Sequence, residues 1–388
     1  MKKTFLDATK ITTTITTSIN ELPKNWDYFS TSNTFLSTKY LKILNLASPE
    51  NMTCHYIGFY RNEALVGIAI AQFFDLNKQK NFGERDRCIK TSIRNFVFKN
   101  LASHVLMIGN NMLTGQNAYQ FDTKIDPKIA FQSLTEATQK LKELYKSKGK
   151  KIHLTSYKDF NESDIENIKS KETKKLYTFC TQPNMVFEIP RLWVSELDYV
   201  AALSKKYRDQ YKRARKKCEG IEKRKLSLPD IINQEDTIYN LYLHVAQNAP
   251  FNTFFLPKNH FSVFKEYMTD HFLFYGYYFN NKMIGFNTLI KNGTVMETYF
   301  LGYDETTQKD KMLYLNMLYD MIGYSIKKKF KQIVFARTAL EIKSSVGARP
   351  IDMFGLIEHE NKLLNWQMER IFTYIEPKTI WKERNPFK

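Results

Sequence analysis

The hydrophobic pattern of one short segment recurs later in the chain. Residues 56–70, YIGFYRNEALVGIAI, align without gaps with residues 274–288, FYGYYFNNKMIGFNT. Each segment has an aromatic run, a short polar turn and a second apolar run, which is the pattern of a β-hairpin. The matched positions include Gly58 with Gly276, Tyr60 with Tyr278, Asn62 with Asn280, and Gly67 with Gly285. A match at a constant offset predicts two copies of one structural unit.

The elements that follow each hairpin come in the same order. The first copy continues with the strand VLMIGNN (105–111), the helical segment 131–150 and the strand KIHLTSY (151–157). The second continues with ETYFLGYD (297–304), the helical segment 311–331 and QIVFART (332–338). The second helical segment has apolar residues every three or four positions, at Met312, Leu315, Tyr319, Ile322, Ile326 and Phe330. Each half therefore reads as hairpin, strand, helix, strand.

Asn292 and Gly293 form a strong turn signal between the runs FNTLI and VMETYF. An Asn-Gly pair between alternating apolar runs predicts a tight turn, so we expect these two runs to be antiparallel neighbours.

A strongly basic segment, SKKYRDQYKRARKK (204–217), lies between the two copies. On a helix, five residues form one narrow stripe, and the cations occupy the rest of the circumference. The stripe consists of Leu203, Tyr207, Tyr211, Ala214 and Cys218. Gly220 then predicts the helix end, and IEKRKLSL a following strand. A disordered basic arm would not need an apolar stripe that packs against the rest of the protein.

These patterns predict an α/β fold with α+β layers, made of two similar domains at residues 1–190 and 191–388. Each domain is expected to contain a mixed, mostly antiparallel sheet flanked by helices. The length of 388 residues agrees with two domains. The composition, 43% hydrophobic and 14% aromatic, is that of a folded chain, so the net charge of +18 must lie mainly on its surface. Such a field attracts nucleic acid, anionic lipid or phosphorylated small molecules.

Other sequence signals limit the class of protein. The N-terminal segment 1–26 has Asp7, Lys10 and a run of Thr where a signal peptide needs an apolar core, so we read it as uncleaved. No stretch approaches the ~20 apolar residues of a membrane span, which predicts a soluble or peripheral protein. The four cysteines, Cys54, Cys88, Cys180 and Cys218, are far apart, which favours reduced thiols in a cytoplasmic protein.

Two similar halves in this order resemble the tandem domains of GNAT-superfamily acyltransferases. The segment 203–227 is similar to the one that opens the second domain of Fem-type aminoacyltransferases and of their CoA-using relatives, where a Lys- and Arg-rich helix precedes a Gly and a strand. ETYFLGYD with its long helix, and ARTALEIKSSVGARP (336–350), resemble the same domain. The resemblance covers about residues 30–375 and rests on the order of the motifs.

This resemblance implies transfer of an acyl or aminoacyl group from a thioester or ester to an amine, in the second domain. In the acetyl-CoA branch the fourth strand splays from the fifth, and its exposed amides hold pantetheine and polarise the carbonyl. By position that strand is residues 298–303, so Phe300, Leu301 and Gly302 are candidate cofactor-binding residues. Glu297 is a candidate general base, although a solvated Glu at a hairpin end is an equally good reading. Tyr299 and Tyr303 are candidate general acids, because period-two spacing puts them on the same strand face as Glu297. The chain has 23 tyrosines, so a role in packing alone is favoured for any single one.

The pyrophosphate loop departs from the GNAT pattern. The chain has Gln308, Lys309 and Lys311 before the long helix but no glycine between Gly302 and that helix. Lysines can bind phosphate as point charges, yet the backbone cradle of glycines is missing. These three residues are the candidate phosphate contacts of a CoA, and the missing cradle weakens the case for CoA.

Candidate substrate-binding residues lie around the expected cleft. Arg337, Glu341 and Lys343 are predicted to form a compact polar group, with a solvated helical turn as the alternative. His260 lies in the aromatic segment PFNTFFLPKNHF (250–261), a candidate pocket wall. Arg208 of the basic helix is a candidate guide for a phosphate-bearing substrate. No Walker loop, Gly-x-Ser-x-Gly elbow or His-Glu-x-x-His motif occurs, so no metal ligands are predicted.

The leading hypothesis is a cytoplasmic GNAT-type N-acyltransferase that uses acetyl-CoA or another acyl-CoA as co-substrate, with no permanently bound cofactor. Its acceptor would be an amine on a small molecule, a lipid or a cell-wall precursor. The first alternative is an aminoacyl-tRNA-dependent enzyme of the peptidoglycan-bridge type, with tRNA as partner. The second is a non-catalytic binder of polyanions, nucleic acid or an anionic membrane surface, which needs only the charge.

Overall fold

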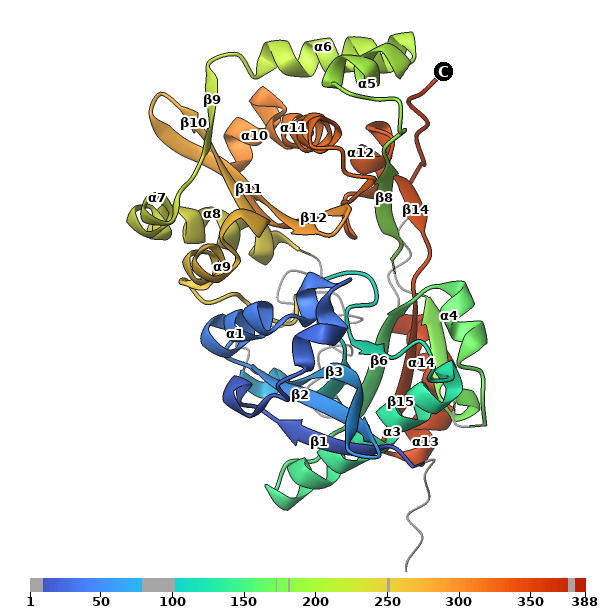
Figure 1. Ribbon diagram of the computed structural model, residues 1–388. Coiled ribbons are helices and arrows are strands. Elements are labelled where there is room, and N and C mark those ends of the chain that lie inside the picture. Colours follow the sequence, from blue (N-terminus) through green and yellow to red (C-terminus); the bar gives the residue numbers. More distant parts are fainter. Residues whose placement is uncertain (1–9, 79–101, 172, 181, 250–251, 376–380) are drawn as a thin grey trace, which may run out of the picture. The chain divides into compact units, whose positions relative to one another are not determined.

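The computed structural model describes residues 10–78, 102–171, 173–180, 182–249, 252–375 and 381–388. The start of the N-terminal segment and Cys88 lie outside these ranges. The chain forms two compact units, the first from residues 1–181 and 353–376 and the second from residues 182–352 and 377–388. Both contain a sheet flanked by helices (Figure 1), which is the predicted α/β class.

The sheet of the first unit has the strand order β1-β2-β3-β4-β6-β15-β7, and β5 pairs with β3. The strands are β1 (Thr12–Thr16), β2 (Met52–Arg61), β3 (Ala64–Asp75), β4 (His104–Ile108), β5 (Tyr119–Phe121), β6 (Leu154–Phe160), β7 (Tyr177–Cys180) and β15 (Phe354–His359). The helices are α1 (Thr38–Ala47), α3 (Pro127–Ser147), α4 (Glu162–Asn167), α13 (Lys362–Trp366) and α14 (Met368–Ile375). Apolar residues of α3 and the inner strands form its core.

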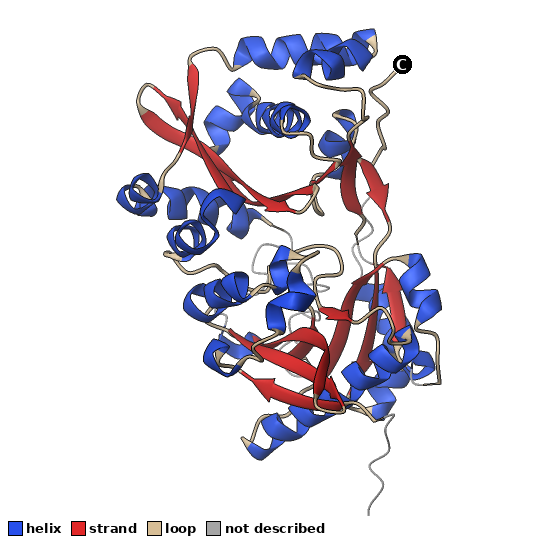
Figure 2. Cartoon of the chain, viewed as in Figure 1, coloured by secondary structure: helices blue, strands red, loops and turns tan. Residues whose placement is uncertain are grey.

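The sheet of the second unit has the order β14-β8-β13-β12-β11-β10-β9. The strands are β8 (Asn184–Glu188), β9 (Ile221–Lys225), β10 (Phe272–Phe279), β11 (Lys282–Asn292), β12 (Val295–Tyr303), β13 (Gln332–Val334) and β14 (Arg349–Ile351). The helices are α5 (Glu196–Ala202), α6 (Lys205–Lys217), α7 (Leu228–Asn233), α8 (Glu235–Asn248), α9 (His260–Met268), α10 (Glu305–Lys311), α11 (Leu313–Lys327) and α12 (Leu340–Ser345). Figure 2 shows this sheet with helices on both of its faces.

The two predicted hairpins form and match in detail. Each pairs antiparallel, and each has a register shift one residue before its matched tyrosine, between Phe59 and Tyr60 and between Tyr277 and Tyr278. The two-residue turns also agree, because all four residues have positive φ: Asn62, Glu63, Asn280 and Asn281. The repeat is therefore structural. The turn after Asn292 also forms, with Gly293 at φ 57° and β11 antiparallel to β12.

The expected division between residues 190 and 191 differs from the observed units. In the first sheet, β6 lies between β4 and β15, and β15 comes from the C-terminal part of the chain. In the second sheet, β13 lies between β12 and β8, and β8 precedes α5. Each half of the chain thus supplies a strand to the other sheet, and a division by sequence position misses this exchange.

The basic segment forms the predicted helix α6, which ends before Gly220 at φ 83°. Leu203, Tyr207 and Ala214 of the stripe are buried in the core of the second unit. Within the described residues, no helix combines the length and the apolar composition needed to cross a membrane. The three described cysteines are free thiols.

One cation of α6 has a structural role. Arg215 forms ion pairs with Glu196 of α5, at 2.5 Å, and with Asp320 of α11, at 2.7 Å. Its guanidinium also lies over the rings of Tyr211 and Tyr319. Because these groups are only partly exposed, the ion pairs link three helices under limited screening by solvent.

We expect Arg215→Met to lower the free energy of unfolding by about 2 kcal/mol, because Glu196 loses its ion pair and Asp320 keeps only the one with Lys223, at 3.3 Å. Arg213→Met on the exposed side of α6 is the matched control and should change stability by less than about 0.5 kcal/mol. Urea unfolding at pH 7 measures both. Equal effects of the two variants would contradict the structural role of Arg215.

Candidate functional site

The pairing of β12 changes along its length. Toward β11 it is antiparallel and extends from Val295 to Tyr303. Toward β13 it is parallel and ends with Glu297 opposite Val334. The rest of β12 therefore has no strand pairing with β13, so its backbone groups on that edge belong to no ladder.

A bulge in β12 decides which side chains share a face. Asn287 pairs with Leu301 and Leu289 pairs with Thr298, so two residues of β12, Tyr299 and Phe300, lie opposite Thr288 alone. The side chains of both bulged residues lie on the side of α8 and α9, where they contact aromatic rings. The register beyond the bulge is therefore shifted by one residue.

The expectation that Tyr303 shares a face with Glu297 is wrong for this reason. Tyr303 packs on the α11 side, against Tyr314 and the main core. Met296, the neighbour of Glu297, is buried in that same core, so Glu297 points to the opposite side. Glu297 and Tyr299 share the α9 side.

A histidine supports Tyr299. His260 is the first residue of α9 and is fully buried, and its Nε2 lies 3.0 Å from the Tyr299 hydroxyl. The two rings are stacked, and Phe264 packs against the tyrosine ring. The structure therefore joins a predicted substrate residue and a predicted catalytic residue in one hydrogen-bonded pair.

The carboxyl group of Glu297 has a perturbed pKa. Burial raises its pKa to about 8, and a hydrogen bond with Asn292 opposes part of the shift. A carboxylate with a pKa near neutrality can take a proton from an ammonium ion and return it. Glu297 is thus the titratable group of β12 with the properties of a general base.

The predicted cofactor-binding strand residues occupy different environments. Gly302 faces α8, where a Cβ atom would come within 2.5 Å of the backbone carbonyl carbon of Leu241. Phe300 contacts the rings of Tyr242 and Phe254. Leu301 lies on the other face, opposite Asn287. Gly302 is needed here for close packing of a helix on the strand.

The predicted phosphate loop is a helix. Asp304 caps α10, and its Oδ1 accepts a hydrogen bond of 2.9 Å from the amide of Thr307. These bonds from Thr307 hold the pKa of the Asp304 carboxyl below its usual value. A negative side chain therefore occupies the position at the helix start that a phosphate would take.

The three polar residues predicted to contact phosphate lie along α10. Lys309 forms an ion pair of 2.8 Å with Glu305, and Lys311 lies over the ring of Phe279. Gln308 donates its backbone amide to the carbonyl of Asp304. Both lysines thus already contact another residue of this chain.

The segment after β13 separates the expected polar group. Lys343 is buried, and its Nζ donates hydrogen bonds to the carbonyls of Ala336, at 3.2 Å, and Arg337, at 2.6 Å. Burial lowers the pKa of Lys343 to about 7. Arg337 donates from Nε to the carbonyl of Gln182. Glu341 instead forms an exposed ion pair with Arg384, so it does not join Lys343.

Lys343 holds a strained turn. Ala336, Thr338 and Ala339 all have positive φ, at 59°, 68° and 47°. Non-glycine residues adopt this region at an energetic cost, and they persist where the surrounding structure over-determines them. The ammonium group of Lys343 supplies part of that constraint directly after β13.

Arg208 lies on α6, which packs against α5, α10 and α11. The structure does not group it with Glu297 and Tyr299. Asn287 is a residue that the sequence interpretation missed. Its side chain is buried, and neither amide atom has a hydrogen-bond partner among the described residues. The only sequence signal was a polar residue inside the apolar run FNTLI.

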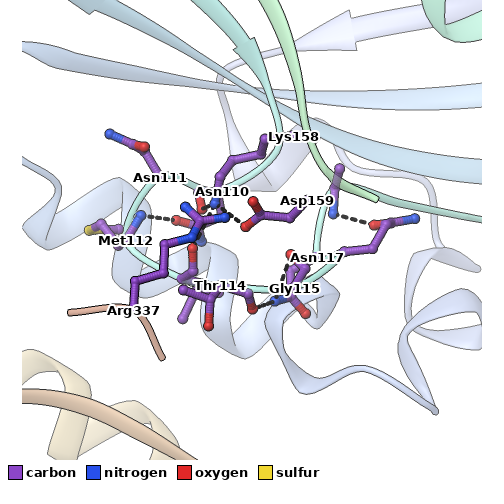
Figure 3. A network of polar contacts seen from close by, with 12 residues as sticks. Asn110, Asn111, Met112, Thr114, Gly115, Asn117, Lys158, Asp159 and Arg337 are labelled. Carbon is purple, nitrogen blue, oxygen red and sulfur yellow. Dashed lines mark hydrogen bonds and ion pairs between the residues drawn. The ribbon is translucent and has the colours of Figure 1, made fainter. Parts of the chain in front are cut away.

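The first unit fills the corresponding place with its own side chains (Figure 3). There β4 pairs parallel to β6 as far as Ile108 and Tyr157. Lys158, the next residue of β6, donates from Nζ to the carbonyls of Asn110, at 3.2 Å, and Leu113, at 2.7 Å, and pairs with Asp159. This place is closed in the first unit, which makes the second unit the better candidate. Among the residues that the structure covers, no group of three His, Cys, Asp or Glu side chains could hold a metal ion.

Comparisons with known proteins agree on the architecture. The fold is similar to that of FemX, with a TM-score of 0.55 at 11% identity over 89% of this chain and 98% of that one. The chain thus has a fold like that of FemX. At 11% identity the likeness shows the fold alone.

Two other solved structures align with TM-scores below 0.5. The tandem GNAT protein from the clavulanic acid biosynthesis pathway gives 0.49 at 8% identity, over 91% of this chain and 99% of that one. L-PGS from Bacillus licheniformis gives 0.47 at 10% identity, over 87% and 94%. No family model matches the sequence, and no curated protein matches it.

The raised pKa of Glu297 predicts a pH dependence of stability. Its folded-state pKa of about 8 lies above the ordinary value of 4.5, so the folded protein binds the extra proton. The contribution is complete below pH 4.5 and is lost as the pH rises through 8, with a slope of at most about 1.4 kcal/mol per pH unit. We expect urea unfolding between pH 5 and 8 to show this fall, and Glu297→Gln to remove it.

Glu341→Gln is the matched control. Arg384 lowers the pKa of the Glu341 carboxyl, so titration of this group changes the free energy of unfolding only at acid pH. It should keep the fall between pH 5 and 8. A Glu297→Gln profile parallel to that of the unmodified protein would contradict the assignment.

Proposed function

We propose that the protein is an acyltransferase that moves an acyl or aminoacyl group from an activated carrier to an amine, at β12 of the second unit. The observation that carries this proposal is the edge of β12 where pairing with β13 stops, beside Glu297 and the Tyr299–His260 pair. Open backbone amides are suited to an oxygen that becomes negatively charged during acyl transfer. The fold supports the same reaction class, because the Fem-type resemblance implies it.

Each step has a group to perform it. The Glu297 carboxylate takes a proton from the ammonium group, and the free amine attacks the carbonyl carbon of the ester or thioester. Amides on the open edge of β12 stabilise the resulting oxyanion. The carbon–oxygen or carbon–sulfur bond then breaks, and the Tyr299 hydroxyl, hydrogen-bonded to His260, protonates the leaving group. The nitrogen of the new amide gives up its second proton, which restores the Tyr299 hydroxyl.

Two acyl donors fit this chemistry, an aminoacyl ester on tRNA and an acyl-CoA, and the start of α10 favours the first. The Asp304 carboxylate caps the start of α10, the helix that carries the predicted phosphate contacts, and it would repel a phosphate there. An aminoacyl ester on tRNA needs no such site, and the net charge of +18 suits a polyanion. We therefore place an aminoacyl ester first among the donors.

Acyl-CoA is the second candidate, favoured by one observation. Helix α11 begins after Met312, which has φ 50°, and its first turn has no side-chain cap. Uncapped amides at a helix start can bind phosphate. The acceptor amine belongs in either case to a small molecule, a lipid or a cell-wall precursor, and the carriers imply a cytoplasmic reaction.

We expect Glu297→Gln to lower kcat at least about 100-fold, because it removes the base. Tyr299→Phe should also lower kcat, whereas Tyr303→Phe, on the opposite face, is the matched control and should keep most activity. The rate should rise with pH to a plateau above about 8 and lose this limb in Glu297→Gln. Transfer of a labelled acyl or aminoacyl group to a panel of primary amines measures these rates. A Tyr303→Phe loss as large as that of Tyr299→Phe would reject the site.

The donor is tested by adding each carrier to the purified protein. With an aminoacyl-ester donor, labelled amino acid should pass from aminoacyl-tRNA to an amine, and 1 mM CoA should leave Tm unchanged. Saturation at 100 times Kd would stabilise the protein by about 2.7 kcal/mol, so a bound CoA would be visible. A raised Tm with CoA, together with transfer from acetyl-CoA, would overturn the order of the donors.

A further inference from the structure

Three apolar side chains near the start of α5 are strongly exposed. Leu192 is 90% exposed, Val194 71% and Leu197 76%. They are fixed in place, because Trp193 between the first two packs against Phe187, Tyr199 and Phe387. The amides of Val194 and Ser195 also donate hydrogen bonds to Asp198, at 2.9 and 2.8 Å. The chain thus holds a rigid turn whose large aliphatic side chains face water.

Unpaired cations of α6 lie next to this turn. Glu196 of α5 accepts hydrogen bonds from Tyr211, at 2.8 Å, and Arg215 of α6, so the start of α5 lies beside that part of α6. Arg208 and Lys212 are one turn away from these contacts, on the same side of the helix. Within the described part of the chain, ion pairing on α6 is confined to Arg215.

The cations of α6 form an outward stripe. Lys205, Lys212 and Lys216 are exposed and follow helical spacing, on the side away from the buried Ala214; the exposed Asp209 is the one anion among them. A cavity of about 510 Å³ beside the turn is lined by Val194, by two carboxylates, Glu196 and Asp320, and by two lysines, Lys223 and Lys327. Lys223 pairs with Asp320 at 3.3 Å, so the cavity adds little net positive charge, and the cations near the aliphatic side chains are those of α6.

We propose that this surface, Leu192, Val194 and Leu197 with the stripe Lys205, Lys212 and Lys216, docks the protein on an anionic lipid bilayer. The cations match the negative surface of such a bilayer, and the aliphatic side chains can insert at the boundary between headgroups and acyl chains. A phosphate backbone of RNA would satisfy the cations but would leave the aliphatic side chains in water. A second copy of the chain would bring the cation stripes of two molecules together. The proposal does not depend on the reaction proposed above.

The test uses the full-length protein and sedimentation with vesicles. The protein should bind vesicles containing 30% phosphatidylglycerol in phosphatidylcholine and should remain free with phosphatidylcholine alone. Lys205→Gln/Lys212→Gln/Lys216→Gln should weaken binding about 100-fold, because each cation near the bilayer contributes about fivefold. Leu192→Ser/Val194→Ser/Leu197→Ser should also weaken it at least about tenfold at unchanged charge.

Matched controls come from the first unit. Lys124→Gln/Lys128→Gln/Lys146→Gln removes the same charge from exposed positions, and Leu363→Ser/Trp366→Ser removes two side chains that are each 76% exposed. Both controls should bind the vesicles like the unmodified protein, and circular dichroism should show all variants folded.

Four results would overturn the proposal. The first is no binding to anionic vesicles. The second is equal losses in the control variants, which would mean attraction by net charge alone. The third is an unchanged affinity of the Leu192/Val194/Leu197 variant, with bulk RNA competing for the same stripe, which would assign the surface to nucleic acid. A concentration-dependent dimer that the serine variant abolishes, without vesicle binding, would likewise assign the apolar turn to a second copy.

Discussion

The second unit depends on one strand that pairs differently with its two neighbours. β12 follows β11 as far as Tyr303 but accompanies β13 only to Glu297. The bulge at Tyr299 and Phe300 allows this, because two residues opposite one bend a strand and increase its twist. It leaves a row of backbone groups without a strand partner, next to Glu297 and Tyr299, and it turns Tyr303 to the opposite face. The candidate chemistry thus depends on a strand that pairs over a longer stretch with one neighbour than with the other.

The two units show how one topology can carry such an opening or close it. In both, a parallel pair ends part-way along the central sheet. The first unit places Lys158 there and satisfies its ammonium group with two carbonyls and Asp159. A buried charge with these partners is tolerated, whereas an unpaired one is costly. The second unit keeps its buried lysine, Lys343, beyond the end of β13, where it holds the strained turn at 336–339.

The charge of α6 is divided by geometry into two functions. Arg215 faces inward and joins α5, α6 and α11 through two carboxylates. The remaining cations face outward, where water screens them and where they contribute little to stability. The same run of Lys and Arg therefore supplies one ion-paired residue between helices and several cations on the surface. Which residue has which role depends on its angle around the helix.

The sequence by itself determined the repeat, the two hairpins, the turn after Asn292 and the stripe of α6, because each is encoded in local spacing. Only the tertiary structure decided the strand exchange of β8 and β15, because an isolated short strand does not specify its partner. It also decided the side of Tyr303, since a bulge leaves no sign in the residue pattern and reverses every face beyond it. The capping of α10 by Asp304 and the burial of Lys343 were likewise decided there, because the depth of a polar side chain depends on what packs around it.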